Sequence, residues 1–338
     1  MKAIFLKKYG SATDSFEFRE VPDPVAGPGQ VLVKVAFSGL NFADVMAVKG
    51  LYKEAPPLPC ILGYDVAGTI SAIGDGVTGF QLGDPVIAAT RFGGYAEKAI
   101  TDARAVTKIP ATWNPANAIA LTTQYCTAFF SASEMVNLHK GDKVLVQSAA
   151  GGVGIALVQY ARYKGCEVFG TAGSEEKLEY IKQLGVDHPI NYTKEDFAGV
   201  INKKTNGYGV DVIFDAVGGA SVSKGIKLLA AGGRLVCYGA SVLSNKTGLA
   251  KLGAGLAFGF YHPAMLMMPS KSIIGVNMLK IADRKPAMMQ HCLQSVVELA
   301  EQGIFVPKDS IVFPAGEIAK AHELLANRKT MGKVVLKW

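Results

Sequence analysis

The stretch of the sequence best suited to hold an anionic ligand is a glycine-rich turn. Residues 143–147 form a short apolar run, the turn 149–154 follows, and apolar residues then recur at helical spacing. Aligned on the motif G-x-G-x-x-G, the turn reads A-A-G-G-V-G, with alanine in the first position. The later glycines still allow close approach of a pyrophosphate and close packing of helix on strand, and the helix N-terminus favours phosphate oxygens. The pattern predicts dinucleotide binding at Ala150, Gly151, Gly152, Val153 and Gly154.

The end of the next strand selects the cofactor. An NAD enzyme of this type needs a carboxylate about 20 residues beyond the turn to bind the ribose 2′-hydroxyl, but this region holds Gly173. Ser174, Lys177 and Tyr192 instead offer two hydroxyls and a cation to a 2′-phosphate, so NADP(H) is the predicted cofactor. Ser174 also fits a helix N-cap, with Lys177 solvated and the two glutamates between them at the positive helix end. Both roles are compatible, although the glutamates lie beside the predicted phosphate.

Composition and charge place the chain among globular proteins of more than one domain. With 338 residues, 49% hydrophobic and 19% charged, it exceeds an ordinary single core. The net charge is +7, but the basic residues are dispersed, so we expect no nucleic acid partner and attribute the charge to an anionic cofactor and to solubility. The N-terminus begins a strand pattern without the features of a signal peptide, so we expect a cytoplasmic protein.

The elements around the turn predict two kinds of structure. The first part of the chain, to about residue 110, is β-rich, with strand patterns at 31–37, 66–73 and 85–89. Residues from about 113 to 139 have helical composition, and from residue 143 strands and helices alternate, which predicts a doubly wound parallel sheet. Its six strands are expected at 143–147, 167–171, 189–192, 211–217, 234–239 and 272–277.

The C-terminal part adds two helices, a strand and an apolar insertion. Residues 285–302 and 315–327 predict helices, and the strand predicted at 332–337 has no place left in the six-stranded sheet, so we expect it to return to the first domain. The apolar segment 252–268 contains three glycines and Pro263, and it is shorter than the about 20 residues of a spanning helix. We expect a buried lid or pocket wall there, with peripheral membrane contact as the alternative.

Motifs along essentially the whole chain carry a family resemblance. GLNFADV, GYDVAG, AAGGVG, FDAVGG and GKVVLKW occur in this order. The sequence resembles the medium-chain dehydrogenase/reductase superfamily, and within it the zinc-free quinone oxidoreductases, while the insertion before SIIGVNM resembles the vesicle amine transport protein branch. The resemblance implies an α/β fold, with a GroES-like, β-rich catalytic domain at 1–122 and 281–338. A Rossmann NADP(H)-binding domain is implied at 123–280.

Residue types argue against a metal site. Zinc alcohol dehydrogenases of this superfamily have a cysteine where this chain has Asn41, and a histidine and a glutamate where it has Tyr64 and Asp65. A catalytic zinc takes three protein ligands of nitrogen, sulfur or carboxylate type, and Asp65 alone does not supply them. The five cysteines are scattered and never form C-x-x-C, so they indicate neither a disulfide framework nor a structural zinc site. We therefore expect no metal.

Without zinc, hydrogen-bond donors must polarise the substrate carbonyl, which fits hydride addition to an enone or a quinone. Tyr52 resembles the tyrosine that related enoyl reductases place over the nicotinamide, so it is our expected proton donor or substrate anchor. Packing at the domain edge is the alternative for Tyr52, and Tyr64 competes for the role. We expect Asn41 to orient the nicotinamide or the substrate carbonyl through its amide.

Further cofactor contacts are expected at strand ends and at the cleft that the resemblance implies. By resemblance, Thr127 corresponds to a superfamily threonine at the cofactor cleft. Val217 and the pair Tyr238 and Gly239 end the fourth and fifth strands, where ligands of doubly wound sheets bind, largely through backbone. Asn277 closes the sixth strand and is expected near the nicotinamide end.

Two classes of function follow. The first is an NADPH-dependent, zinc-independent reductase of a small hydrophobic quinone or α,β-unsaturated carbonyl. The second is a catalytically weak NADP(H)-binding protein with a structural or membrane-associated role, as the vesicle-protein resemblance allows. A homodimer is expected through the edge of the sixth strand, because an open sheet exposes unpaired backbone groups there.

Overall fold

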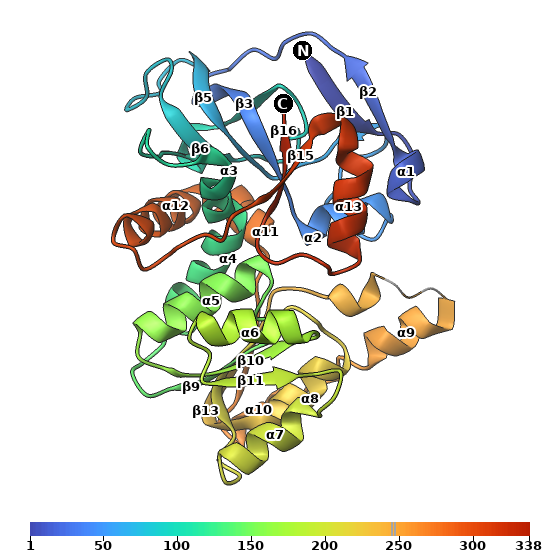
Figure 1. The fold of residues 1–338 in the computed structure, drawn as a ribbon, viewed down its shortest axis with the longest axis vertical. Helices are drawn as coiled ribbons and strands as arrows, with labels where there is room; N and C mark the ends of the chain where they lie inside the picture. The colour runs from blue at the N-terminus through green and yellow to red at the C-terminus, as the bar shows by residue number, and fades with distance from the viewer. Residues whose placement is uncertain (245, 247) are drawn as a thin grey trace. The chain divides into compact units, whose positions relative to one another are not determined.

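The computed structural model describes residues 1–244, 246 and 248–338, and this chain divides into two compact units. The first unit contains Met1–Cys126, Met278–Glu301 and Pro307–Trp338, and the second contains Thr127–Asn277 and Gln302–Val306. Figure 1 shows the β-rich first unit and the second unit with its sheet and flanking helices. The fold is of the expected α/β class, with antiparallel sheets in the first unit and a parallel sheet in the second. The domain boundaries read from the sequence stay predictions.

Antiparallel strands build the first unit. Three strands form a small sheet in the order β2-β1-β4, and seven form a larger one along the path β15-β16-β3-β5-β6-β8, with β7 paired to β3. The strands are β1 (Lys2–Leu6), β2 (Phe16–Glu20), β3 (Gln30–Leu40), β4 (Cys60–Ile61), β5 (Asp65–Ile73), β6 (Pro85–Ala89), β7 (Lys98–Asp102), β8 (Val106–Lys108), β15 (Ile311–Pro314) and β16 (Val334–Lys337). The last strand therefore returns to the first unit, as the sequence predicted.

Strand register in the larger sheet brings distant polar residues together. In the β3–β16 pair Val334 lies opposite Leu40, and in the β3–β5 pair Ser38 lies opposite Val66. Asn41 follows the end of β3, Asp65 begins β5, and Lys333 directly precedes β16. The register thus gathers three polar side chains at one end of this sheet.

Six parallel strands form the sheet of the second unit. They are β9 (Lys143–Val146), β10 (Glu167–Ala172), β11 (His188–Asn191), β12 (Val210–Asp215), β13 (Leu229–Cys237) and β14 (Ser272–Gly275), in the order β11-β10-β9-β12-β13-β14. The inner strands are near-continuous apolar runs and almost wholly buried, as expected for strands covered on both faces. The predicted doubly wound sheet is therefore confirmed.

Helices cover the sheet of the second unit. Helices α5 and α6 pack against β10, α7 against β11, and α8 against β12 and β13. The helices are α1 (Ala12–Ser15), α2 (Phe42–Val48), α3 (Pro115–Ala118), α4 (Cys126–Phe129), α5 (Gly152–Tyr163), α6 (Glu175–Gln183), α7 (Phe197–Lys204), α8 (Ala220–Leu228), α9 (Gly248–Leu256), α10 (Pro263–Met267), α11 (Met278–Arg284), α12 (Pro286–Glu301) and α13 (Ile318–Ala326). Within the described ranges, no helix combines the length and the apolar character needed to cross a bilayer.

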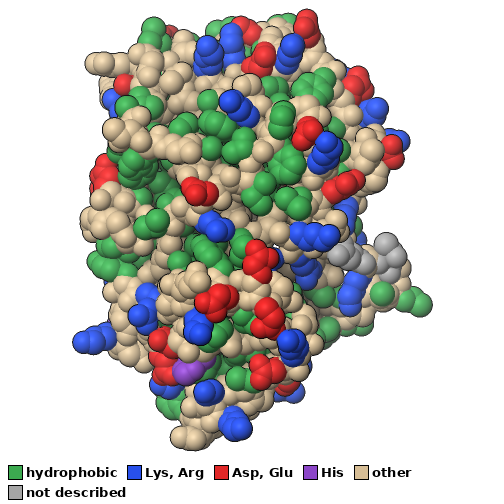
Figure 2. Space-filling view, in the orientation of Figure 1, with side chains coloured by type: hydrophobic (Ala, Val, Ile, Leu, Met, Phe, Trp, Pro, Cys, Tyr) green, Lys and Arg blue, Asp and Glu red, His purple; other side chains and the backbone are tan. Residues whose placement is uncertain are grey.

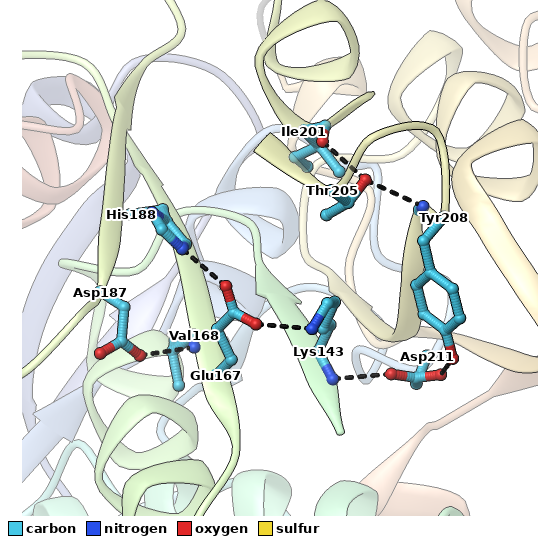
Figure 3. A network of polar contacts seen from close by, with 10 residues as sticks. Lys143, Glu167, Val168, Asp187, His188, Ile201, Thr205, Tyr208 and Asp211 are labelled. Carbon is cyan, nitrogen blue, oxygen red and sulfur yellow. Dashed lines mark hydrogen bonds and ion pairs between the residues drawn. The ribbon is translucent and has the colours of Figure 1, made fainter. Parts of the chain in front are cut away.

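A polar network joins the amino ends of the parallel strands (Figure 3). Lys143 Nζ and His188 Nε2 each lie 2.7 Å from an oxygen of Glu167, so the first residues of β9, β10 and β11 are linked. The Lys143 N–H donates to Asp211 near the start of β12, at 2.7 Å. The network therefore links the amino ends of the strands. The nucleotide turn lies at their opposite, carboxyl ends, after β9.

The apolar insertion is not buried, and the expectation of a buried lid or pocket wall is wrong. Helices α9 and α10 carry exposed side chains, and Figure 2 shows hydrophobic groups on the α9 segment beside the undescribed residues. The exposed large apolar residues are Leu249, Leu252, Leu256, Phe260, Met265, Met267 and Met268. The glycines and Pro263 divide the segment into two short helices, while Phe258 and Tyr261 between them pack against the core of the second unit.

Candidate functional site

The nucleotide turn runs from the end of β9 to the start of α5. Thr171 at the end of β10 anchors the turn, because its Oγ1 accepts from the Ser148 N–H at 3.1 Å and donates to Gln147 Oε1 at 2.7 Å. Ser148 has a positive φ of 57°, and its carbonyl oxygen accepts from the Gly151 N–H at 2.9 Å. These bonds fix the chain reversal that the sequence predicted after the first strand.

Steric space around the glycines matches their predicted roles. A Cβ at Gly154 would lie 2.4 Å from the Ser148 carbonyl oxygen and 2.8 Å from Ala149 Cα, so a side chain there would push α5 off the turn. A Cβ at Gly151 would meet the same carbonyl oxygen at 3.2 Å, a milder conflict. Gly154 is therefore required for close packing within the protein, while Gly151 leaves backbone accessible to a ligand.

The N-terminus of α5 has the donors that a phosphate needs. Gly151 is its N-cap, and within the described chain no side chain caps this helix. The first N–H groups of an α-helix have no acceptor inside the helix, so those of Gly152, Val153 and Gly154 point beyond its end. A twelve-residue helix also brings partial positive charge to this end. The turn thus fits an anionic pyrophosphate.

The residues predicted to select the cofactor come together after β10. Tyr192 lies directly against Gly173, because a Cβ at Gly173 would be 2.5 Å from the tyrosine hydroxyl. Ser174 is the N-cap of α6, and its Oγ accepts from the Lys177 N–H at 3.4 Å. The capping role of Ser174 is thus present, and it brings Lys177 to the same corner. The Tyr192 hydroxyl and Ser174 thus lie at the end of β10, where a 2′-phosphate is expected, and Lys177 follows in the first turn of α6.

One of the two glutamates beside this corner is already engaged. Glu175 Oε1 accepts from Asn191 Nδ2 at 2.9 Å and from Lys194 Nζ at 2.8 Å. Hydrogen bonds from Lys194 and Asn191 lower the pKa of Glu175, so it stays ionised beside a compensating cation. The pairing offsets part of the repulsion that this carboxylate would exert on a phosphate, although an exposed ion pair is weak.

A buried aspartate shapes the loop after β12. Asp215 accepts from the N–H groups of Val217 at 2.8 Å and Gly218 at 2.6 Å, and it also binds the Ser221 hydroxyl. The Val217 carbonyl oxygen accepts from Val242 at 2.9 Å, so both backbone groups of Val217 take part in internal bonds. The predicted backbone contact of Val217 with the cofactor is therefore restricted to the second lone pair of its carbonyl oxygen.

The remaining predicted cofactor residues lie at ends of elements. Tyr238 and Gly239 follow β13, where a Cβ at Gly239 would lie 2.7 Å from the Ala216 carbonyl oxygen, so this loop is tightly packed. Thr127 is buried within α4, at the beginning of the second unit. Asn277 is exposed beyond β14, where the chain leaves that unit. Thr127 and Asn277 are thus the first and last residues of the longer segment of the second unit, and their roles stay predictions.

In the first unit, Asn41 belongs to a buried ion-pair network. Asn41 Nδ2 donates to Asp65 Oδ1 at 3.0 Å, and Lys333 Nζ donates to Asn41 Oδ1 at 2.9 Å and to Asp65 Oδ2 at 2.6 Å. The side chains of Asp65 and Lys333 are 0% exposed, and Asn41 as a whole is 7% exposed. The Asn41 amide is therefore held in one orientation by a carboxylate on one side and an ammonium on the other.

This network does not fit a zinc ion. The Lys333 ammonium already occupies the position next to the Asn41 and Asp65 oxygens, so a divalent cation there would face strong repulsion. At the position where zinc alcohol dehydrogenases have a histidine, this chain has Tyr64, whose phenol is not an imidazole ligand. In the part of the chain that the structure describes, no three His, Cys, Asp or Glu side chains form a group able to hold a metal ion.

Tyr52, the predicted proton donor, lies in an aromatic cluster with Tyr64 and Phe92. Its ring meets that of Tyr64 edge to face, with centroids 6.0 Å apart, and Tyr64 packs on Phe92 at 5.0 Å. Burial is the main cause that raises the pKa of Tyr52 above its ordinary value, and the nearby Glu54 and Asp44 carboxylates raise it further. Tyr52 is half-buried, so it is both packed and reachable. The two expected roles, a packing residue and a catalytic group, are compatible.

Asp44 is a charged group that the sequence analysis missed. Its carboxylate accepts from the Asn41 N–H at 2.9 Å and from the Gly63 N–H at 3.2 Å, which joins the start of α2 to the loop before β5. Complete burial, together with the nearby Asp65 carboxylate, raises the pKa of Asp44 to about 7 despite these bonds. The pattern N-x-x-D at a helix start was the available signal, because it is typical of a capping box.

Lys333 was missed for a different reason. It lies 292 residues from Asn41 and 268 from Asp65, and sequence alone does not show which distant residue neutralises a buried carboxylate. The available signal was a lysine next to the apolar strand VVLK. Asp215 had a similar signal, an acid at the end of a buried strand.

Family models match both parts of the chain. The alcohol dehydrogenase GroES-like domain matches residues 27–111, and the zinc-binding dehydrogenase model matches residues 152–294. The human synaptic vesicle membrane protein VAT-1 homolog is 36% identical over 322 residues, which cover 94% of this chain and 81% of that protein. A mycocerosic acid synthase-like polyketide synthase of Mycobacterium tuberculosis is 32% identical over 95% of this chain, but this chain spans only 15% of that protein.

Solved structures agree over the whole chain. A Pseudomonas syringae quinone oxidoreductase has a TM-score of 0.88 and 26% identity, covering 100% of this chain and 99% of its own. A mycobacterial protein complexed with NADPH has a TM-score of 0.88 and 28% identity, covering 100% of both chains. The CurK enoyl reductase has a TM-score of 0.87 and 28% identity, covering 99% of this chain and 98% of its own.

Proposed function

We propose a function from the premise that this chain belongs to the medium-chain dehydrogenase/reductase superfamily, in the branch of zinc-free quinone oxidoreductases and VAT-1 homologs. The chain is an NADPH-dependent reductase of small hydrophobic quinones or α,β-unsaturated carbonyls. Among the similar structures are a quinone oxidoreductase, an enoyl reductase and a protein complexed with NADPH. The substrate class and the site residues are the proposed parts.

The observation that carries the proposal is a pair of anion sites at the carboxyl ends of the parallel strands in the second unit. The uncapped N-terminus of α5 suits the pyrophosphate, and the corner of Gly173, Ser174, Lys177 and Tyr192 suits a 2′-phosphate. A carboxylate that would bind a 2′-hydroxyl is replaced by Gly173. This arrangement favours NADP(H) over NAD(H).

The residues of the first unit suit reduction without a metal. When bound, the reduced nicotinamide supplies the hydride, which adds to the β-carbon of an enone or to a quinone. The substrate oxygen then gains negative charge, and hydrogen-bond donors stabilise it. Tyr52 donates the proton that completes the reduction, and burial favours its protonated form. Asn41 orients the ligand with its second Nδ2 hydrogen, because Asp65 and Lys333 fix the amide plane.

Turnover assays test this proposal. Purified protein is mixed with NADPH and a series of quinones and enones, and NADPH oxidation is followed with and without a chelator. The proposal expects turnover of at least one member of either class, undiminished by the chelator. Tight NADPH binding without turnover of any quinone or enone would contradict it.

A second candidate is a catalytically weak NADP(H)-binding protein associated with a membrane surface. The observation that favours it is the exposed apolar run on α9 and α10, together with the likeness to a synaptic vesicle membrane protein. Sedimentation with liposomes tests it. Binding that is lost when Phe260 and Met268 are replaced by serine, in a protein without reductase activity, would favour this candidate over the enzyme.

We also propose a homodimer joined through β14. This strand pairs with β13 on one side and is the last in the order of its sheet. An edge strand leaves a row of backbone groups unpaired, and the same edge of a second chain pairs with them about a twofold axis.

A further inference from the structure

We propose that Tyr64 is a positioning residue for Tyr52: its hydroxyl donates a hydrogen bond to the Tyr52 oxygen as Tyr52 passes its proton to the reduced substrate. The inference rests on the proposed function, because it assigns the second half of that reaction to a pair of phenols. It concerns side chains of the first unit alone.

The first observation is a buried hydroxyl group whose hydrogen-bonding capacity is unused. Tyr64 is 7% exposed, and in the described part of the chain its Oη has no partner at hydrogen-bonding distance. A buried donor without an acceptor is costly, and native proteins leave few such groups. The Tyr64 hydroxyl is therefore available to an acceptor that arises during the reaction.

The second observation is that Tyr52 is close enough to become that acceptor. The two rings meet edge to face at a centroid distance of 6.0 Å and an interplanar angle of 80°. In the resting protein the Tyr64 hydroxyl makes no hydrogen bond, so it is not engaged elsewhere in the described part of the chain. A full negative charge on the Tyr52 oxygen would draw this hydroxyl into a hydrogen bond, because hydrogen bonds to charged groups are shorter and stronger.

The third observation is that Tyr64 is held firmly. Phe92 packs on its ring at 5.0 Å and has a φ of 77°, a conformation that a bulky residue rarely adopts. Arg91 lies over the Phe92 ring at 5.1 Å and pairs with Asp283 at 2.7 Å. Backbone strain of this kind persists where the surrounding structure imposes it, and it clusters at functional sites. The Tyr64 ring thus has little freedom to turn away from Tyr52.

The proposed step balances in atoms and charge. Hydride addition forms a C–H bond at the β-carbon and leaves an enolate, whose carbon or oxygen takes the phenolic proton of Tyr52 as the O–H bond breaks. The Tyr52 oxygen then carries the negative charge, and the Tyr64 O–H donates to it without giving up its own proton. Solvent finally returns a proton to Tyr52, which is half-buried.

Charged groups around Tyr52 and Tyr64 are consistent with Tyr52 as the proton donor and Tyr64 as the hydrogen-bond donor. Burial raises the pKa of both phenols, and the Asp44 carboxylate raises both further. Glu54 also raises the pKa of Tyr52, whereas Arg91 lowers that of each phenol. A hydrogen bond donated by Tyr64 to Tyr52 would lower the pKa of Tyr52 and raise that of Tyr64. The half-buried phenol is therefore the one that loses its proton, and the deeper phenol remains a donor.

The first test measures ionisation and needs no substrate. A fluorinated tyrosine incorporated at position 52, which ionises at lower pH than tyrosine, is titrated by fluorine NMR in the otherwise unchanged chain and in Tyr64→Phe. We expect a higher pKa at position 52 in Tyr64→Phe. Tyr95→Phe is the matched control, since it removes a buried hydroxyl that contacts His322 and should leave the titration unchanged. An unchanged pKa in Tyr64→Phe would overturn the inference.

The second test is a double-mutant cycle on enone turnover. Tyr64→Phe should lower turnover about tenfold to a hundredfold in the native background and have almost no effect in a Tyr52→Phe background, because the assisted oxygen is then absent. A purely structural role would give the same loss in both backgrounds, and that result would overturn the inference. Failure of the proposed function is distinct: the native protein would then reduce neither enone nor quinone, while the titration would still report on the phenol pair.

Discussion

At the scale of single residues, a lysine ammonium neutralises the buried carboxylate beside Asn41. Lys333 contacts the Asn41 and Asp65 oxygens in a fully buried position. Buried charges of this kind are retained only when they are paired and hydrogen-bonded. In the proposed reaction the polarising groups are oriented neutral donors, the Asn41 amide and the two phenols.

Replacing Lys177 by alanine should weaken NADPH binding specifically. The loss of one charge-assisted contact to a phosphate costs about 1.5–3 kcal/mol, so the NADPH dissociation constant should rise about tenfold to a hundredfold while that of NADH stays unchanged. Lys182→Ala, in the last turn of the same helix, is the control. Titration calorimetry decides, and equal effects on both cofactors would contradict the 2′-phosphate site.

Asp44 makes stability depend on pH. Its pKa is raised to about 7 in the folded chain, so between about pH 4 and pH 7 the folded state binds more protons than the unfolded state, and stability falls as pH rises through this window. The free energy of unfolding of Asp44→Asn, measured relative to that of the native chain, should therefore rise by about 2–4 kcal/mol between pH 4 and pH 8.

Denaturant unfolding of both proteins at the two pH values measures this difference. Burial lowers the pKa of His322 to about 3, so both proteins lose stability as pH falls below about 6.5. This effect opposes that of Asp44, and it cancels when the two proteins are compared at each pH. A pH-independent difference between Asp44→Asn and the native chain would show that Asp44 is ionised throughout.

At the scale of elements, the turn between β9 and α5 has little tolerance for a side chain. Gly154→Ala would place Cβ 2.4 Å from a carbonyl oxygen, so we expect a loss of about 1–3 kcal/mol in unfolding free energy and weaker NADPH binding. Gly199→Ala in α7, where nothing lies within 4 Å, is the control and should stabilise slightly. Urea denaturation curves compare the two, and equal midpoints would contradict the packing role of Gly154.

Local patterns predicted the elements well, because each element is specified by its own residues. The six strands, the glycine turn and the return of the final strand were all found from apolar periodicity and turn residues. The apolar insertion was misjudged, since hydrophobicity alone does not tell whether the rest of the chain covers a segment. Lys333 and Asp215 were missed because their importance depends on contacts that strand register and loop geometry create.

At the scale of the whole molecule, the edge of the second unit's sheet predicts the oligomeric state. The Val276 N–H donates inward to Cys237 on β13, so in this strand the alternate N–H of Gly275 points to the outer edge. Gly275→Pro removes this donor and should convert a dimer into a monomer at micromolar concentration, while Gly275→Ala should stay dimeric. Light scattering measures the mass, and a monomeric native chain would refute the proposed interface.

Isotopic labelling tests whether the chain transfers hydride from NADPH to a conjugated carbonyl without a metal. Metal-free protein is incubated with an enone and NADPH carrying deuterium at the transferable position of C4, and the product is analysed by NMR. We expect one deuterium on the β-carbon, a solvent proton on the α-carbon, and the same rate after chelator treatment. Product without deuterium, or activity that requires added zinc, would contradict the proposed transfer.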